Sequence, residues 1–151
     1  MKSREELDAV LVMLCEMIFE GRELDPDTFG RVGACVIDPR GTRIVGISTD
    51  PDQSVDKMIH AETVAISRYR NMFGDIPRGS IIVTTLSPCN THMHDRYGVD
   101  CQEVIKRAGI KYIYSGYKDP TQDKETSDQT DNKDIIKLCK KIADTFLYDR
   151  H

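Results

Sequence analysis

The chain has 151 residues, of which 39% are hydrophobic and 30% charged, and its formal net charge at pH 7 is -4. A chain of this length folds as one domain that buries roughly 70% of its unfolded surface, so we expect a single domain over residues 1–151. No apolar run approaches the ~18 residues of a membrane span, and the apolar stretch near the N-terminus is broken by Glu16 and Glu20, so it lacks the features expected of a secretory signal. We therefore expect a cytoplasmic protein, and its charge balance argues against a nucleic-acid partner held by a broad basic field.

The first third of the chain predicts a helix followed by a β-hairpin. Apolar residues recur at steps of three and four between residues 4 and 20, which is typical of an amphipathic helix with one buried stripe. Segments 31–38 and 43–48 have the residue pattern of strands and lie on either side of the turn residues 39–41. The two segments are therefore predicted to pair as antiparallel strands.

The middle of the chain predicts a second helix and a central strand. Residues 58–73 contain few helix breakers and are followed by Gly74, a C-cap candidate, so a helix is expected that starts at His60. Residues 80–86 are apolar and β-branched on both faces, as in a central strand that helices cover on both sides.

The last third predicts a helix over 101–107, a strand over 111–115 and a final helix over 132–148. The stretch 119–134 is polar, with six acidic and two basic residues, and is expected to be a mobile surface loop or an active-site lid. The resulting order αββαβαβα predicts an α/β fold, a three-layer α/β/α sandwich with a central mixed sheet flanked by helices.

The cysteines do not suggest a disulfide framework, because their number is odd and their spacing uneven. They are Cys15, Cys35, Cys89, Cys101 and Cys139. The first, second and last lie on apolar faces of predicted elements and are expected in the core. The other two are candidates for metal ligands.

A catalytic zinc site is predicted from His60 and Glu62 at a helix start, Cys89 after a strand, and Cys101 at another helix start. One imidazole and two thiolates give a tetrahedral Zn²⁺ whose fourth position remains open to water, and the metal lowers the pKa of that water to roughly 7. Glu62 follows His60 by two residues and projects in a different direction from the same turn, which suits a residue that transfers protons near the metal.

The identity of the third ligand has three interpretations, because eleven residues separate Cys89 from Cys101. We favour Cys101, since a helical pattern follows it and leads into a strand. His92 could instead be the ligand in a C-x-x-H arrangement, or His92 and His94 could hold a second metal. If Cys101 is the ligand, both histidines lie in a loop that borders the substrate.

At these residues the chain resembles the cytidine and deoxycytidylate deaminase superfamily, and within it the deoxycytidylate deaminases. The similarity spans about residues 31–115. The segments that carry it are Val32–Ile37, Arg43–Ile47, His60–Glu62, Pro88–Asn90, and Cys101 with Ala108–Lys111. The resemblance implies the deaminase fold, zinc, and hydrolytic release of ammonia from a cytosine-type nucleotide, nucleoside or base, with dCMP as the leading substrate.

The resemblance also implies which other residues lie near the substrate: Asp50, Ala61, Ser87, His92 and His94. Deoxycytidylate deaminases usually carry a Tyr-Asn-Gly segment after the second strand, whereas this chain has Thr49-Asp50-Pro51. A carboxylate beside a substrate phosphate is repulsive, which favours a nucleoside, free base or modified pyrimidine, unless Asp50 is only a turn residue.

Two further functions share the same chemistry. The widely spaced cysteines and the Lys118-Asp119-Pro120 segment are similar to the pyrimidine deaminase of riboflavin synthesis, and deaminases of nucleic-acid bases are the other alternative. Because only 7% of the residues are aromatic and no basic stripe is evident, a small-molecule aminopyrimidine is the expected partner. The resemblance also implies a homo-oligomer, with Met17, Phe19 and Phe73 either at its interface or in the core.

Overall fold

The computed structural model describes residues 3–24, 29–49, 60–88, 101–118 and 127–148, and the account below is confined to them. The helices are α1 (Arg4–Leu24), α2 (Ala61–Phe73), α3 (Cys101–Arg107) and α4 (Lys133–Tyr148). The strands are β1 (Phe29–Ile37), β2 (Arg43–Thr49), β3 (Ile81–Leu86), β4 (Tyr112–Tyr117) and β5 (Asp128–Gln129).

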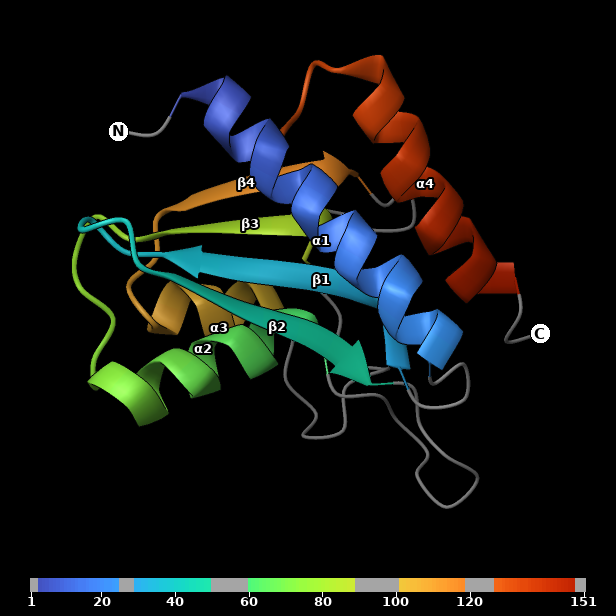
Figure 1. Cartoon of the computed structure of the whole chain (residues 1–151). Coiled ribbons are helices and arrows are strands. Elements are labelled where there is room, and N and C mark those ends of the chain that lie inside the picture. The colour runs from blue at the N-terminus through green and yellow to red at the C-terminus, as the bar shows by residue number, and fades with distance from the viewer. Residues whose placement is uncertain (1–2, 25–28, 50–59, 89–100, 119–126, 149–151) are drawn as a thin grey trace.

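The five strands form one mixed sheet in the order β2-β1-β3-β4-β5. Strand β1 pairs antiparallel with β2 and with β3, whereas β3–β4 and β4–β5 are parallel pairs. Helices α1 and α4 cover one face of the sheet and α2 and α3 cover the other (Figure 1). The predicted three-layer α/β/α sandwich is thus confirmed, including its mixed sheet.

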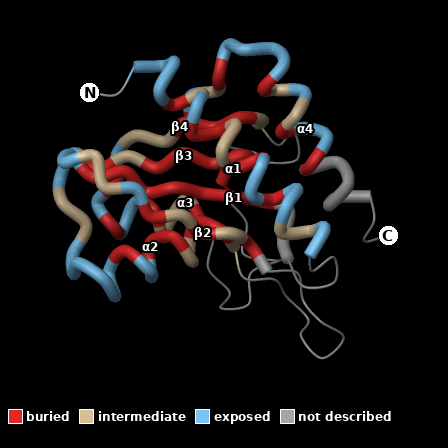
Figure 2. The backbone as a smooth tube through the Cα atoms, viewed as in Figure 1, coloured by how far each residue is buried: buried red, intermediate tan, exposed pale blue. Residues whose placement is uncertain are grey.

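The side chains of β1 alternate between two hydrophobic cores, as the period of two in a strand requires. Cys35 and Ile37 pack in the core beneath α1 and α4, whereas Ala34 and Val36 pack in the core beneath α2 and α3. The central strands are accordingly buried along most of their length (Figure 2). As expected from the sequence, Cys15, Cys35 and Cys139 are core residues.

The prediction of a loop over 119–134 is wrong for its second half. Residues Asp128–Gln129 form β5, and the flanking Ser127 and Thr130 are 4% and 2% exposed. Polarity misled the prediction, because these side chains are buried in hydrogen bonds: Ser115 Oγ donates to Ser127 Oγ at 2.8 Å, and the Thr130 N–H donates to the carbonyl of Ser115 at 2.9 Å. Residues 119–126 lie outside the described part of the chain.

The sequence left open whether three apolar residues lie in the core or at a subunit interface, and all three are exposed. Met17, Phe19 and Phe73 have 36%, 43% and 48% of their surface accessible, so none of them belongs to the core. Among the residues that the structure describes, no helix has the length and apolar character needed to cross a membrane.

Candidate metal centre

Three potential metal ligands converge where α2 and α3 begin. His60 precedes α2, Glu62 lies in its first turn, and Cys101 is the first residue of α3. One ligand atom from each residue lies within 4.8 Å of the others, and His60 Nδ1 is 2.9 Å from Cys101 Sγ. Glu62 and Cys101 are only 3% and 0% exposed, so the cluster is buried between the two helix starts.

His60 occupies the N-cap of α2, as its position before the apolar pattern predicted. Its backbone is extended, with φ -75° and ψ 147°, and its carbonyl accepts the hydrogen bond of the Val64 N–H. The imidazole makes no capping hydrogen bond to the helix and instead faces Cys101. The N-cap backbone therefore directs the ring towards α3 and leaves Glu62 two residues further along, in the first turn of α2.

The other end of α2 is fixed to the hairpin by Asp38. The Tyr69 hydroxyl donates to Asp38 Oδ2 at 2.8 Å, and the N–H groups of Arg40 and Thr42 donate to Oδ1 at 2.9 Å. Burial raises the pKa of Asp38, but these hydrogen bonds lower it by more, so the pKa lies below its ordinary value. A buried carboxylate thereby holds the helix in a defined orientation on β1 and β2.

The start of α3 is tied to the end of β3. Gln102 Nε2 donates to the carbonyl of Pro88 at 3.1 Å, and the Ser87 N–H donates to the carbonyl of Tyr117 at 2.8 Å. Ser87 and Pro88 are both buried. Sequence reasoning missed Gln102, and no local signal marks it, because its role depends on how closely α3 approaches β3.

The predicted site residues fall into two groups. The structure brings together His60, Glu62 and Cys101, with Ala61 buried beneath them and Ser87 at the end of β3. The remaining predicted residues lie outside the described part of the chain: Asp50, Cys89, His92 and His94.

The donor set fits zinc. Imidazole nitrogen and thiolate sulfur are the ligands that Zn²⁺ prefers, with metal distances of about 2.0–2.1 Å and about 2.3 Å. A tetrahedral zinc separates such a pair by roughly 3.5 Å. The 2.9 Å between His60 Nδ1 and Cys101 Sγ therefore needs to open by about 0.6 Å to admit the metal.

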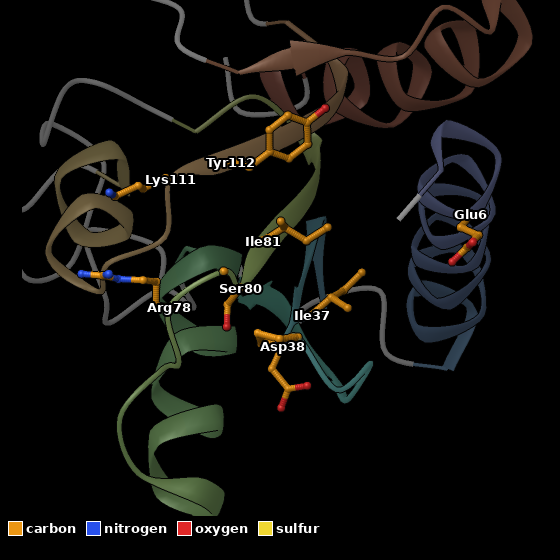
Figure 3. Close-up of a pocket in the computed structure, with 10 residues that line it drawn as sticks. Glu6, Ile37, Asp38, Arg78, Ser80, Ile81, Lys111 and Tyr112 are labelled. Atoms are coloured by element: carbon orange, nitrogen blue, oxygen red, sulfur yellow. The ribbon is translucent and has the colours of Figure 1, made fainter. Parts of the chain in front are cut away.

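A separate cavity of about 700 Å³ lies at the opposite end of the sheet from this cluster, where β3 and β4 begin. It is bordered by Glu6 of α1 on one side and by Arg78 and Lys111 on the other. The head groups of Arg78 and Lys111 extend to the same side, away from Glu6 (Figure 3). None of the clustered metal ligands lines this cavity, so it is distinct from the candidate metal centre.

Residues 6–117 match the family model of the cytidine and deoxycytidylate deaminase zinc-binding region. This match covers most of the chain and includes all three clustered residues. The chain therefore belongs to the cytidine and deoxycytidylate deaminase family, whose model describes a zinc-binding region, and His60, Glu62 and Cys101 are positioned as a possible zinc site. No curated protein sequence matches the chain significantly.

Solved structures with related folds include two proteins, and this chain spans about two fifths of the length of each. One is a diaminohydroxyphosphoribosylaminopyrimidine deaminase/5-amino-6-(5-phosphoribosylamino)uracil reductase from Thermotoga maritima, with 24% identity and a TM-score of 0.57 over 91% of this chain and 42% of that one. The other is RibD from Acinetobacter baumannii, with 16% identity and a TM-score of 0.65 over 96% of this chain and 40% of that one. These similarities establish the shared fold.

Proposed function

We propose that this protein catalyses the zinc-dependent hydrolytic deamination of a small aminopyrimidine, with dCMP to dUMP as the first reaction to test. The observation that carries the proposal is the buried convergence of His60, Glu62 and Cys101 at the starts of two helices in a chain of the deaminase family. A structural zinc site would not need Glu62, because a closed tetrahedral site is completed by cysteine and histidine alone.

In this proposal His60 and Cys101 hold the metal and Cys89 is the third ligand. The hydrogen bond from Gln102 to Pro88 supports this assignment, because it holds the residue before Cys89 beside the residue after Cys101. His92 is the competing third ligand. When bound, zinc supplies Lewis-acid activation of water at neutral pH.

Glu62 moves the protons of the reaction. It takes a proton from the attacking water and delivers it to the ring nitrogen beside the reacting carbon. The second proton of that water passes through Glu62 to the amine, so that the new C–O bond replaces the C–N bond and ammonia leaves. Because Glu62 is 3% exposed, bulk water has little access to the carboxylate during these transfers.

The net charge and the aromatic content of the chain support a small-molecule substrate. A net charge of -4 and the scarcity of aromatic residues favour a small molecule over a nucleic acid. The aminopyrimidine of riboflavin synthesis is the second candidate, favoured by the eleven residues between Cys89 and Cys101. We further propose a homo-oligomer in which the exposed Met17, Phe19 and Phe73 contribute to the contact between subunits.

Ammonia release from cytosine, cytidine, deoxycytidine, their monophosphates and the riboflavin-pathway aminopyrimidine tests the proposal. We expect turnover of at least one of them, and a loss of about 10²–10⁴-fold in Glu62→Gln with zinc retained, as for removal of a general acid/base. Glu103→Gln is the matched control, because Glu103 lies near the site but forms an exposed ion pair with Arg107. Zinc-loaded protein that turns over none of these compounds would refute the proposed function.

A further inference from the structure

Strand β2 approaches the first turn of α2 so closely that only glycine fits at position 46. A Cβ atom built on Gly46 would lie 2.3 Å from Ala65 N, 2.5 Å from Ala61 O and 2.9 Å from Ala65 Cα. All three atoms belong to the helix backbone, so no side-chain rotation relieves the contact. The fully buried Ala61 and Ala65, four residues apart on one face of α2, are the small residues that complete this close approach.

The same helical turn carries two members of the metal cluster. His60 immediately precedes Ala61 and Glu62 immediately follows it. The third member, Cys101, belongs to α3, which packs against α2 and whose start is held beside the end of β3 by the hydrogen bond from Gln102 to the carbonyl of Pro88. Because Gln102 holds the start of α3 beside Pro88, the distance between β2 and α2 contributes to how far His60 and Glu62 lie from Cys101.

We propose that Gly46 is a positioning residue for the metal centre: its missing side chain fixes the height of the first turn of α2 above the sheet. An alanine at this position would push the turn outward by about 1 Å, from 2.3 Å to the 3.4 Å at which ordinary contact begins. Zinc sites tolerate ligand distances within only about 0.2 Å of their preferred values, so this displacement is several times too large.

Gly33 provides a matched control within the same hairpin. It lies on β1, next to β2, but a Cβ there would meet only side-chain atoms of Ile47, Leu14 and Ile18 at 3.3–3.4 Å, on the α1 face of the sheet. Gly33→Ala thus adds the same methyl group without touching α2. The two variants separate a general loss of stability from a displaced metal ligand.

The test compares Gly46→Ala, Gly33→Ala and the parent protein by zinc affinity in chelator competition, by the thiolate-to-cobalt absorption of the Co²⁺-loaded protein, and by thermal melting. We expect Gly46→Ala to weaken zinc binding at least tenfold and to alter the cobalt spectrum, and to lower kcat/KM about 10²-fold, as a misplacement of 1 Å does. Gly33→Ala should keep the parent's cobalt spectrum and zinc affinity, even if its melting temperature falls as far as that of Gly46→Ala.

Two outcomes overturn the inference: a Gly46→Ala protein with the parent's spectrum and zinc affinity, or a Gly33→Ala protein that loses as much affinity at an equal loss of melting temperature. If Gly46→Ala fails to fold, Ala65→Val replaces it, because this change enlarges the same contact from the helix side. A folded Ala65→Val protein with the parent's cobalt spectrum would also contradict the inference. The inference rests on the metal site of the proposed function, yet metal binding needs no substrate. Failure of the substrate panel and failure of this test are therefore distinguishable.

Discussion

The two faces of the sheet are built from residues of different size. The core beneath α1 and α4 is rich in large aliphatic side chains such as Leu7, Leu11 and Leu14. The core beneath α2 and α3 contains several alanines, and it is there that β2 contacts a helix backbone through Gly46. Large side chains bury the most apolar area, whereas small ones let backbones approach. One face thus supplies stability and the other supplies fixed distances.

The polar groups on the two faces also differ in what they pair with. On the α1 side, Asp8 Oδ1 accepts hydrogen bonds from the Tyr114 hydroxyl at 2.7 Å and from Thr130 Oγ1 at 2.6 Å, which joins α1 to β4 and to the residue after β5. On the α2 side, the ligand atoms of His60, Glu62 and Cys101 face one another. The first set consists of donors paired with an acceptor, and the second is a group of side chains that could hold a metal ion.

Replacing a buried cysteine on each face should give the largest contrast. Cys101→Ser removes a proposed zinc ligand, and we expect zinc affinity to fall by more than about 100-fold, since losing an outer-shell partner alone costs 10–100-fold. Cys139→Ser, a change of the same size at a thiol that is 1% exposed on the other face, should retain full zinc content. Zinc analysis of the purified variants decides between ligand and packing roles, and equal zinc loss in both would contradict the comparison.

Truncating the α1 core should lower stability without altering the metal centre. Leu11 is 0% exposed, so Leu11→Ala is expected to reduce the free energy of unfolding by about 2–5 kcal/mol. Leu24 on the same helix is 88% exposed, and Leu24→Ala should change the free energy of unfolding by less than about 0.5 kcal/mol. Urea denaturation gives both values. A changed cobalt spectrum in folded Leu11→Ala would show that the two faces are not independent.

The smallest effect is expected from removing the hydrogen bond between Tyr114 and Asp8 on the α1 face. Tyr114→Phe should cost about 1.5–3 kcal/mol, as for a hydrogen bond to a charged acceptor. Burial and the Asp8 carboxylate raise the pKa of Tyr114 to about 12, although a hydrogen bond from Thr130 and the charge of Arg4 oppose them. The folded state then holds this proton more tightly than the unfolded state, whose tyrosine pKa is about 10.

Stability conferred by Tyr114 is therefore fully present below about pH 10 and is lost as the pH rises towards about 12. Denaturant titrations across this range should show a smaller loss in Tyr114→Phe than in the parent protein. Tyr117→Phe, at a half-buried tyrosine on the same strand, serves as the control. An identical pH profile in the parent and in Tyr114→Phe would exclude this origin of the alkaline instability.

Within the described part of the chain, periodicity was sufficient to predict every helix and four of the five strands, because the amphipathic pattern of α1 and the apolar run of β3 are strong local signals. It was also sufficient to place His60 at the start of α2. Strand β5 escaped prediction because its two residues are polar and their neighbours are buried by hydrogen bonds formed only in the folded chain.

Within the site, residue types and spacing predicted the His60, Glu62 and Cys101 cluster, because metal ligands are chemically distinctive. The residues that hold the cluster in place carry no such mark. A glycine in a strand and a glutamine at a helix start are ordinary in sequence, and their roles emerge only from the 2.3 Å separation at Gly46 and the hydrogen bond between Gln102 and Pro88.

The use of His60 as the N-cap has a cost for the helix that it begins. A serine, threonine, aspartate or asparagine at this position would accept a hydrogen bond from the first turn and stabilise it by about 1 kcal/mol, but the imidazole is directed at Cys101 instead. The start of α2 therefore receives no capping hydrogen bond from the His60 side chain and depends on tertiary packing. In the proposed site, fraying of this turn would also displace a metal ligand, so metal occupancy and local unfolding would be thermodynamically linked.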